Sequence, residues 1–213
     1  MDASAEPDGD ARRRAPARRR PARPVRSLTP VTVTRLTVND WVTVGFAILG
    51  EQGIKGIKID RMAERLGVTK GSFYWHFRDL DDFLDALTTK WAEEMGTRYL
   101  ATAGSPDEHP STRMQNRLRV FLSRQVRMLD REMRHWARSD SRAREALGRT
   151  DRQIYAQITR DLSDLGFGEA EAAWRGSVLF YASIGYAAVD HPLTEADLRS
   201  EAFKLLQLLT ARD

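Results

Sequence analysis

The chain of 213 residues contains no cysteine. That absence excludes disulfide bridges, thiolate metal ligands and a cysteine nucleophile, and it fits a cytoplasmic protein. No apolar run approaches the roughly 18 residues that a membrane-spanning helix needs, so we expect no contact with a membrane. The sequence also lacks β-hairpin turn signals and internal repeats.

An excess of positive charge is present but confined to one segment. The chain carries 34 basic and 30 acidic residues, and residues 1–30 hold eight arginines against four acids, which accounts for the whole net charge of +4. Because this segment also holds five of the eight prolines and few large apolar side chains, we expect a disordered tail. No apolar run follows the arginines, which argues against an export signal. A basic arm attracts polyanions such as nucleic acid.

The remainder of the chain shows the apolar spacing of helices. Thr37 or Asn39 is placed to cap a first helix that ends at Gly53, and Asp79 is placed to cap a fourth. Gly45 and Gly50 lie inside the first helix and cost about 1 kcal/mol each relative to alanine, unless close packing compensates. The expected helices span 37–53, 59–66, 69–77, 79–99, 111–137, 140–164, 169–189 and 194–211. The predicted fold class is therefore all-α, with about nine helices.

The segment from Ile57 to Leu87, IKIDRMAERLGVTKGSFYWHFRDLDDFLDAL, indicates the function. Two short helices joined by a tight turn at Gly67-Val68-Thr69 form a helix-turn-helix, whose second helix enters the major groove of DNA. That helix is lined by groups that bond to phosphates and base edges: Lys70, Ser72, Tyr74, Trp75 and His76. Residues 55–78 carry six basic side chains against two acidic ones, as phosphate binding requires.

The run MAERLGVTKGSFYWHF at 62–77, followed by Asp79 and by LDAL at 84–87, resembles the N-terminal domain of the tetracycline-repressor (TetR) family. The resemblance covers about residues 37–90. It implies a homodimer that binds an operator in double-stranded DNA, and a divergent C-terminal domain that binds a small-molecule effector. Binding of the effector then moves the two recognition helices apart.

The resemblance also assigns residues. It places DNA contacts at Thr69, Lys70, Gly71, Ser72, Tyr74, Trp75 and His76. The chain departs from the family in having Leu80 where a phosphate-binding lysine is usual, and Lys58 where threonine or serine commonly caps the second helix. Lys58 and Arg78 can replace the lost phosphate contact, so Lys58 joins the expected DNA-binding residues.

Three regions follow from this assignment: a tail over 1–30, a helix-turn-helix domain over 31–82, and an effector-binding and dimerisation domain over 83–213. Large or hydrogen-bonding side chains are the candidates for the effector pocket, namely Met128, Trp136, Tyr155 and Trp174, although core packing is an alternative for each. Apolar stripes on the last two helices predict a four-helix dimer interface. Its expected residues are Trp174, Val178, Ala182, Gly185, Leu198, Ala202, Leu205 and Leu209.

Other functions have less support from the sequence. A sequence-tolerant DNA-binding protein driven by the basic tail is the alternative to a repressor. The arginine-rich run from Arg113 to Arg152 is interspersed with acids, which favours a solvated helix face over a second nucleic-acid surface. The histidines lack metal-ligand spacing, and no nucleophile–base pair or phosphate loop is present, so we expect neither a metal, nor a cofactor, nor an enzyme.

Overall fold

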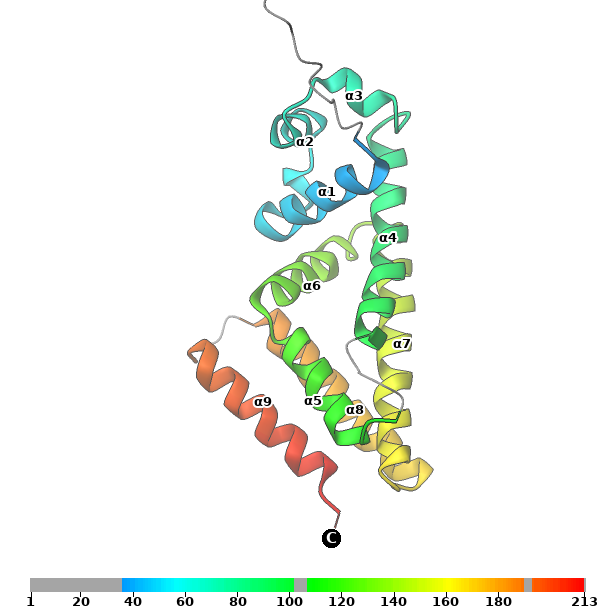
Figure 1. Ribbon diagram of the computed structural model, residues 1–213, viewed down its shortest axis with the longest axis vertical. Coiled ribbons are helices and arrows are strands. Elements are labelled where there is room, and N and C mark those ends of the chain that lie inside the picture. Colours follow the sequence, from blue (N-terminus) through cyan, green and yellow to red (C-terminus); the bar gives the residue numbers. More distant parts are fainter. Residues whose placement is uncertain (1–35, 102–106, 190–192, 213) are drawn as a thin grey trace, which may run out of the picture. The chain divides into compact units, whose positions relative to one another are not determined.

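The computed structural model describes residues 36–101, 107–189 and 193–212. In these residues the chain forms nine α-helices and one short 3₁₀ helix, and no strand (Figure 1), which confirms the all-α prediction. The elements are α1 (Val38–Gln52), η1 (Ile54–Gly56), α2 (Ile59–Leu66), α3 (Lys70–Tyr74), α4 (Leu80–Ala101), α5 (Pro110–Phe121), α6 (Arg124–Trp136), α7 (Ser141–Asp164), α8 (Glu169–Ala188) and α9 (Glu195–Thr210). The predicted tail over 1–30 lies outside the described residues. Within the described ranges, none of the helices combines the length and the apolar character needed to cross a membrane.

Local sequence signals set both ends of α1. The Thr37 side chain accepts a hydrogen bond from the Asp40 backbone N–H at 3.3 Å, and the Thr37 N–H donates to the Asp40 carboxylate at 2.7 Å. This reciprocal pair is a capping box, with aspartate in place of the usual glutamate. The bond from the Thr37 N–H to the carboxylate, together with one donated by the Thr37 hydroxyl at 2.7 Å, lowers the pKa of Asp40. At the other end Gly53, with φ of 67°, closes the helix as expected.

Close packing explains one of the two glycines inside α1. A Cβ atom added at Gly45 would lie 2.6 Å from the Phe83 ring and 3.2 Å from Leu87, both fully buried on α4. The missing side chain therefore lets α1 and α4 approach each other. At Gly50 the nearest atoms, those of Leu129, lie 3.9 Å away, which is ordinary contact.

We expect Gly45→Ala to lower the free energy of unfolding by about 1–2 kcal/mol, because overpacking outweighs the gain in helix propensity. Gly50→Ala, in the same helix, should raise it by up to about 1 kcal/mol, since only the propensity term applies. Urea denaturation of the two variants beside the wild type measures both effects. A Gly45→Ala variant as stable as Gly50→Ala would contradict the packing argument.

The helix predicted over 111–137 is two helices, α5 and α6, so that prediction was wrong. The chain breaks at Leu122 and Ser123, where Ser123 adopts extended dihedral angles of −64° and 138°. Leu122 is fully buried, and Arg127 donates a hydrogen bond to its freed carbonyl at 2.5 Å. The break lets α6 pack against α1, while α5 packs against α7 and α9. Tertiary packing, and not a glycine or proline, decides the boundary.

The arginine-rich run from Arg113 to Arg152 is not simply a solvated helix face. The expectation from its alternation with acids was wrong in this respect. Arg113 and Arg117 on α5 are 9% and 3% exposed, and both donate to the fully buried carboxylate of Asp161 on α7. Arg134 on α6 likewise bonds to Asp130 and Asp151. These arginines therefore join helices in the interior of the fold.

Candidate nucleic-acid interface

The turn between α2 and α3 has the geometry that the sequence predicts. Gly67 ends α2 with φ of 66° and ψ of 30°, the left-handed conformation that glycine adopts without strain. The Val68 N–H donates to the Ala63 carbonyl at 3.0 Å, which covers one of the free carbonyls at the helix end. Thr69, with extended dihedral angles, then begins α3. Its hydroxyl makes no capping bond and is exposed, so it is available to a ligand.

A buried aromatic side chain fixes α3 on the rest of the domain. Phe73 is fully buried, and its ring meets Trp41 edge-on at a centroid distance of 5.4 Å. It also contacts Phe77 at 5.1 Å and Phe83 at 5.9 Å. One side chain of this five-residue helix therefore joins α1 and α4, and the opposite side of α3 is left facing outward.

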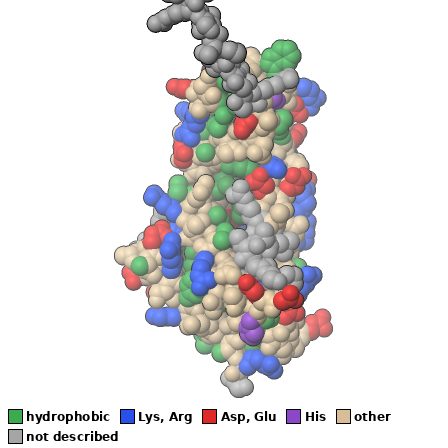
Figure 2. Space-filling model, in the orientation of Figure 1, with side chains coloured by type: hydrophobic (Ala, Val, Ile, Leu, Met, Phe, Trp, Pro, Cys, Tyr) green, Lys and Arg blue, Asp and Glu red, His purple; other side chains and the backbone are tan. Residues whose placement is uncertain are grey.

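The outward side of α3 and the turn that follows it carry most of the expected DNA-contacting residues. Tyr74 is 58% exposed and Trp75 is 82% exposed, which is unusual for side chains of this size. Lys70 and Gly71 are exposed as well, and Ser72 is partly buried. Figure 2 shows apolar and basic side chains side by side at the end of the molecule where α3 lies. The surface offers both stacking groups and a cation.

His76 differs from the other members of the predicted set. Its ring lies 6.5 Å from the Trp41 ring and 6.3 Å from the Phe77 ring, and the residue is partly buried. The helix ends at Tyr74, earlier than the predicted Phe77, so that Trp75 and His76 belong to a turn. Phe77 is 4% exposed and belongs to the core. His76 is thus directed partly towards the core, through its contacts with Trp41 and Phe77.

Most of the cations around α2 and α3 have partners within the fold. The Lys70 ammonium lies 2.5 Å from Asp60, and Arg65 pairs with Glu51. Arg78 bonds to Asp82 at 3.3 Å. Lys58 is exposed at the start of α2, and no described carboxylate pairs with it. A phosphate that approaches Lys70 has to compete with Asp60, whereas Lys58 needs no exchange of partners.

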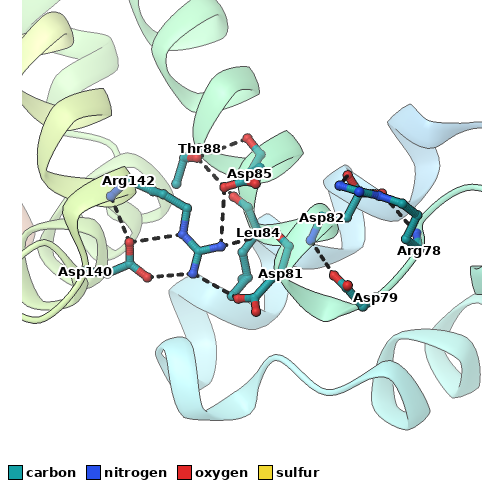
Figure 3. Close-up of polar contacts among 9 residues, drawn as sticks. All are labelled: Arg78, Asp79, Asp81, Asp82, Leu84, Asp85, Thr88, Asp140 and Arg142. Carbon is teal, nitrogen blue, oxygen red and sulfur yellow. Dashed lines mark hydrogen bonds and ion pairs between the residues drawn. The ribbon is translucent and has the colours of Figure 1, made fainter.

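Arg142, in the first turn of α7, connects that helix to α4 (Figure 3). Its guanidinium donates to Asp140 at 3.0 Å, to Asp81 at 3.1 Å and to Asp85 at 3.3 Å. Asp140 caps α7, and its bonds with Arg142 lower its pKa. Asp81 and Asp85 lie in the first turns of α4, so Arg142 ties the start of α4 to the start of α7.

Comparisons with known proteins agree with this geometry. The profile described as bacterial regulatory proteins, tetR family, matches residues 42–87, from α1 to α4. Tetracycline repressor protein class C of Escherichia coli is 30% identical over 159 residues, which cover 73% of this chain and 66% of that protein. The chain belongs to the TetR family. A second relative, the class A repressor from transposon 1721 of Escherichia coli, is 35% identical over 71 residues, a third of each chain.

Solved structures with the same fold extend over most of the chain. A TetR transcriptional regulator from Legionella pneumophila is 12% identical with a TM-score of 0.63, and covers 82% of this chain and 94% of its own. Reduced NemR of Escherichia coli is 16% identical with a TM-score of 0.60, and covers 81% and 93%. At these identities the likeness concerns the fold alone. The chain spans between a third and about two thirds of the length of the two repressors named above.

The expected dimer residues differ in how far they are exposed on the subunit. Trp174 and Val178 are 51% and 40% exposed on α8, while Ala182, Gly185 and Leu205 are partly buried. Three others on α9 lie inside the subunit at 3–6% exposure: Leu198, Ala202 and Leu209. The inner side of α9 packs against α5 and α8, so an apolar stripe there fills the core.

Two exposed apolar side chains were absent from the sequence-based set. Tyr181 on α8 is 68% exposed, and it continues the spacing of Trp174 and Val178 along one side of that helix. Leu208 on α9 is 69% exposed. Arg175 donates to the Leu209 carbonyl at 3.1 Å, which brings the end of α9 beside the first half of α8. Helical spacing from Trp174 could have identified Tyr181.

The four candidates for an effector pocket are not brought together. Trp136 is 2% exposed in the core that also holds α1 and α4, and Trp174 is exposed to solvent. Tyr155 packs in a separate core between α7 and α8, where its hydroxyl donates to the Ala173 carbonyl at 3.3 Å. Met128 borders a cavity that none of the other three lines.

Proposed function

We propose that the protein is a transcriptional repressor that binds a pseudo-palindromic operator as a homodimer and is released by a small molecule. The observation that supports DNA binding is the outward side of α3. Tyr74 and Trp75 are exposed there beside Lys70, while Phe73 anchors the same helix in the core. A rigid helix with exposed aromatic, hydroxyl and cationic groups is suited to the major groove. The tetracycline repressors to which the chain is similar lend the proposal weight.

Cation chemistry supports the same proposal. Lys58 and Lys70 lie at the starts of α2 and α3, where backbone N–H groups also attract phosphate. These two lysines would fix the register of the domain on the DNA backbone, and the side chains of α3 would read the bases. A regulator of this kind acts without a catalytic residue, in the bacterial cytoplasm where its operator lies.

The homodimer would form through α8 and α9. Trp174, Val178 and Tyr181 expose a row of apolar surface along α8, with Leu208 of α9 at one end of it. Burial of such a row against a second copy would remove it from water. Two-fold symmetry then places two copies of α3 on successive turns of DNA, about 34 Å apart.

The test of the dimer is a charge placed in this row of apolar side chains. We expect Tyr181→Asp to raise the dimer dissociation constant by about 100-fold or more, because an unpaired carboxylate would be buried in an apolar contact. Sedimentation equilibrium measures that constant. Val120→Asp, at a partly exposed valine of α5, is the matched control and should leave the mass unchanged. A Tyr181→Asp protein that remains as dimeric as the wild type would place the interface elsewhere.

The test of the function is selection of bound fragments from genomic DNA, followed by footprinting at near-physiological salt. A protected inverted repeat with half-sites about 10 base pairs apart, or a multiple of that, is the expected result. Diffuse binding that falls steeply with salt and leaves no footprint would favour the sequence-tolerant alternative. Deletion of residues 1–30 then separates the two, since a repressor should retain its footprint without them.

A further inference from the structure

The described part of the chain contains a cavity of about 590 Å³ between α1, α4 and α6. Apolar side chains of all three helices line it: Phe46 and Ala47 of α1, Trp91 and Met95 of α4, and Met128 and Leu129 of α6. Polar and charged residues also line the cavity: Thr43, Glu51, Glu94, Arg124 and Gln125. Pockets that hold drug-sized molecules have about 300–1,000 Å³ and mostly apolar walls. A second apolar cavity, lined by α5, α7, α8 and α9, has only about 60 Å³. Two other cavities, of about 290 and 440 Å³, have several charged residues in their walls. Of the two apolar cavities, the larger one therefore has room for an organic ligand.

A buried donor lines this cavity. Trp91 is 1% exposed, and no described group accepts a hydrogen bond from its indole N–H. Its ring meets Phe46 edge-on at 6.3 Å, which holds the side chain in place. An indole donor buried without an acceptor is unfavourable. Neighbouring atoms shield the indole nitrogen almost completely, so a ligand oxygen would satisfy it after a small shift of the Trp91 ring.

The charges at the rim favour an uncharged ligand. Glu51 pairs with Arg65, and Glu94 lies 3.5 Å from Lys90. Arg124 is exposed at the same rim. The carboxylates at the rim are thus already balanced by nearby cations. A cationic ligand would therefore have to displace one of these cations, and an anion paired with the exposed Arg124 would stay at the rim, outside the apolar part of the cavity.

From these observations we propose that the cavity between α1, α4 and α6 binds an uncharged, mainly apolar molecule that accepts a hydrogen bond from Trp91. The inference rests on the proposed function, because such a molecule would be the effector. A ligand there touches α1, the first helix of the DNA-binding domain, and α6, which belongs to the rest of the chain. A ligand that binds better when these helices are further apart would shift the protein away from the DNA-binding arrangement.

Benzophenone is a suitable probe, because it is an uncharged diaryl ketone that attaches to nearby C–H bonds when irradiated. We expect irradiation of the full chain with benzophenone to label peptides that contain Met95 or Met128, as read by mass spectrometry. Ala47→Phe fills the cavity from an exposed position and should abolish that labelling. Ala156→Phe, at an exposed alanine of α7, is the matched control and should retain it. Labelling confined to other peptides, or unaffected by Ala47→Phe, would overturn the proposal.

The hydrogen bond has a separate test. Diphenylmethane has the shape of benzophenone without the ketone oxygen, so the wild type should bind benzophenone about fivefold more tightly. Trp91→Phe removes the donor and should make the two affinities equal, as measured by calorimetry. Trp41→Phe is the control, because Trp41 is also buried without an acceptor among the described groups but does not line the cavity. A Trp91→Phe variant that keeps the preference would refute the assigned donor.

Operator binding is measured on the same samples. If the operator is bound and the cavity is not labelled, the site assignment fails and the proposed function stands. If the cavity is labelled and no DNA fragment is bound, the proposed function fails and the ligand site stands.

Discussion

Asp161→Asn should lower the free energy of unfolding by about 3–5 kcal/mol, the usual cost of removing one partner from a buried ion pair. Asp161 is fully buried and accepts hydrogen bonds from Arg113 at 3.1 and 3.2 Å, from Arg117, and from Gln157 at 3.2 Å. Asparagine keeps the shape of the side chain but removes its negative charge. Arg113 and Arg117 then lose the carboxylate that faces them in the interior. Denaturant unfolding followed by circular dichroism measures the loss.

Asp164→Asn is the matched control on the same helix. Asp164 bonds to Arg113 at 2.5 Å, but its side chain is 46% exposed. Water therefore replaces much of what the substitution removes, and we expect a change below about 1 kcal/mol. Equal losses for the two variants would show that burial of Asp161 does not set the cost.

A further variant separates the contribution of the ion pair from the penalty of breaking it. When Arg113, Arg117 and Asp161 are all replaced by apolar residues of similar size, no charge of this trio is left in the interior, and Asp164, which loses its bond with Arg113, is half-exposed to water. Such replacements of buried ionic groups are often neutral or stabilising. We expect the triple variant to be more stable than Asp161→Asn, which would identify the missing negative charge beside the two buried arginines as the source of the loss.

Much of the DNA-binding domain could be predicted because its signals are local. The cap of α1, predicted at Thr37 or Asn39 and found at Thr37, the bounds of α2 and the turn at Gly67 each depend on residues within five positions of one another. Asp79 accepts a hydrogen bond from the Asp82 N–H at 2.8 Å, as a capping residue should. Both partners of such a bond lie within one short stretch of sequence, so the residue types in that stretch predict the cap or the turn.

The missed features depend on contacts between distant residues. No glycine or proline marks the break at Leu122, because it follows from the packing of α6 on α1. Arg113 and Arg117 lie more than 40 positions from their partner Asp161 in the sequence. The sequence shows only that arginines and acids alternate in this region, and that pattern is also typical of a solvated helix face. The pairing of Lys70 with Asp60 likewise requires the angle between α2 and α3. Sequence patterns do not contain these distances.

The candidate site divides in the same way. The motif predicts that Tyr74 and Trp75 belong to the recognition element, and both side chains are exposed. The motif does not show that Phe73 between them and the turn is fully buried, nor that His76 turns partly towards Trp41. The dimer and effector residues were drawn from long helices with weaker patterns. There, the side of the helix that faces the core depends on the packing of all the other helices.

Removal of the two exposed aromatic side chains beside α3 should greatly weaken binding to DNA. We expect the double variant Tyr74→Ala/Trp75→Ala to bind the operator about 100-fold more weakly, since each contact of a recognition helix contributes about 1–3 kcal/mol. Its thermal stability should change little, because both side chains are mostly exposed. Fluorescence anisotropy with operator DNA measures the affinity. Val120→Ala, at an exposed apolar residue far from α3 in sequence, is the control and should bind normally.

Substitutions at the Lys70–Asp60 pair should act in opposite directions and on all DNA sequences alike. Lys70→Ala removes a cation, so we expect about tenfold weaker binding and a salt dependence shallower by about one counterion. Asp60→Asn releases Lys70 from its 2.5 Å partner and removes a negative charge beside α3, so binding should tighten several-fold. Neither substitution should change the preferred operator, because a phosphate contact carries no base information. If Asp60→Asn weakens binding instead, Asp60 orients Lys70 towards the phosphate and does not compete with it.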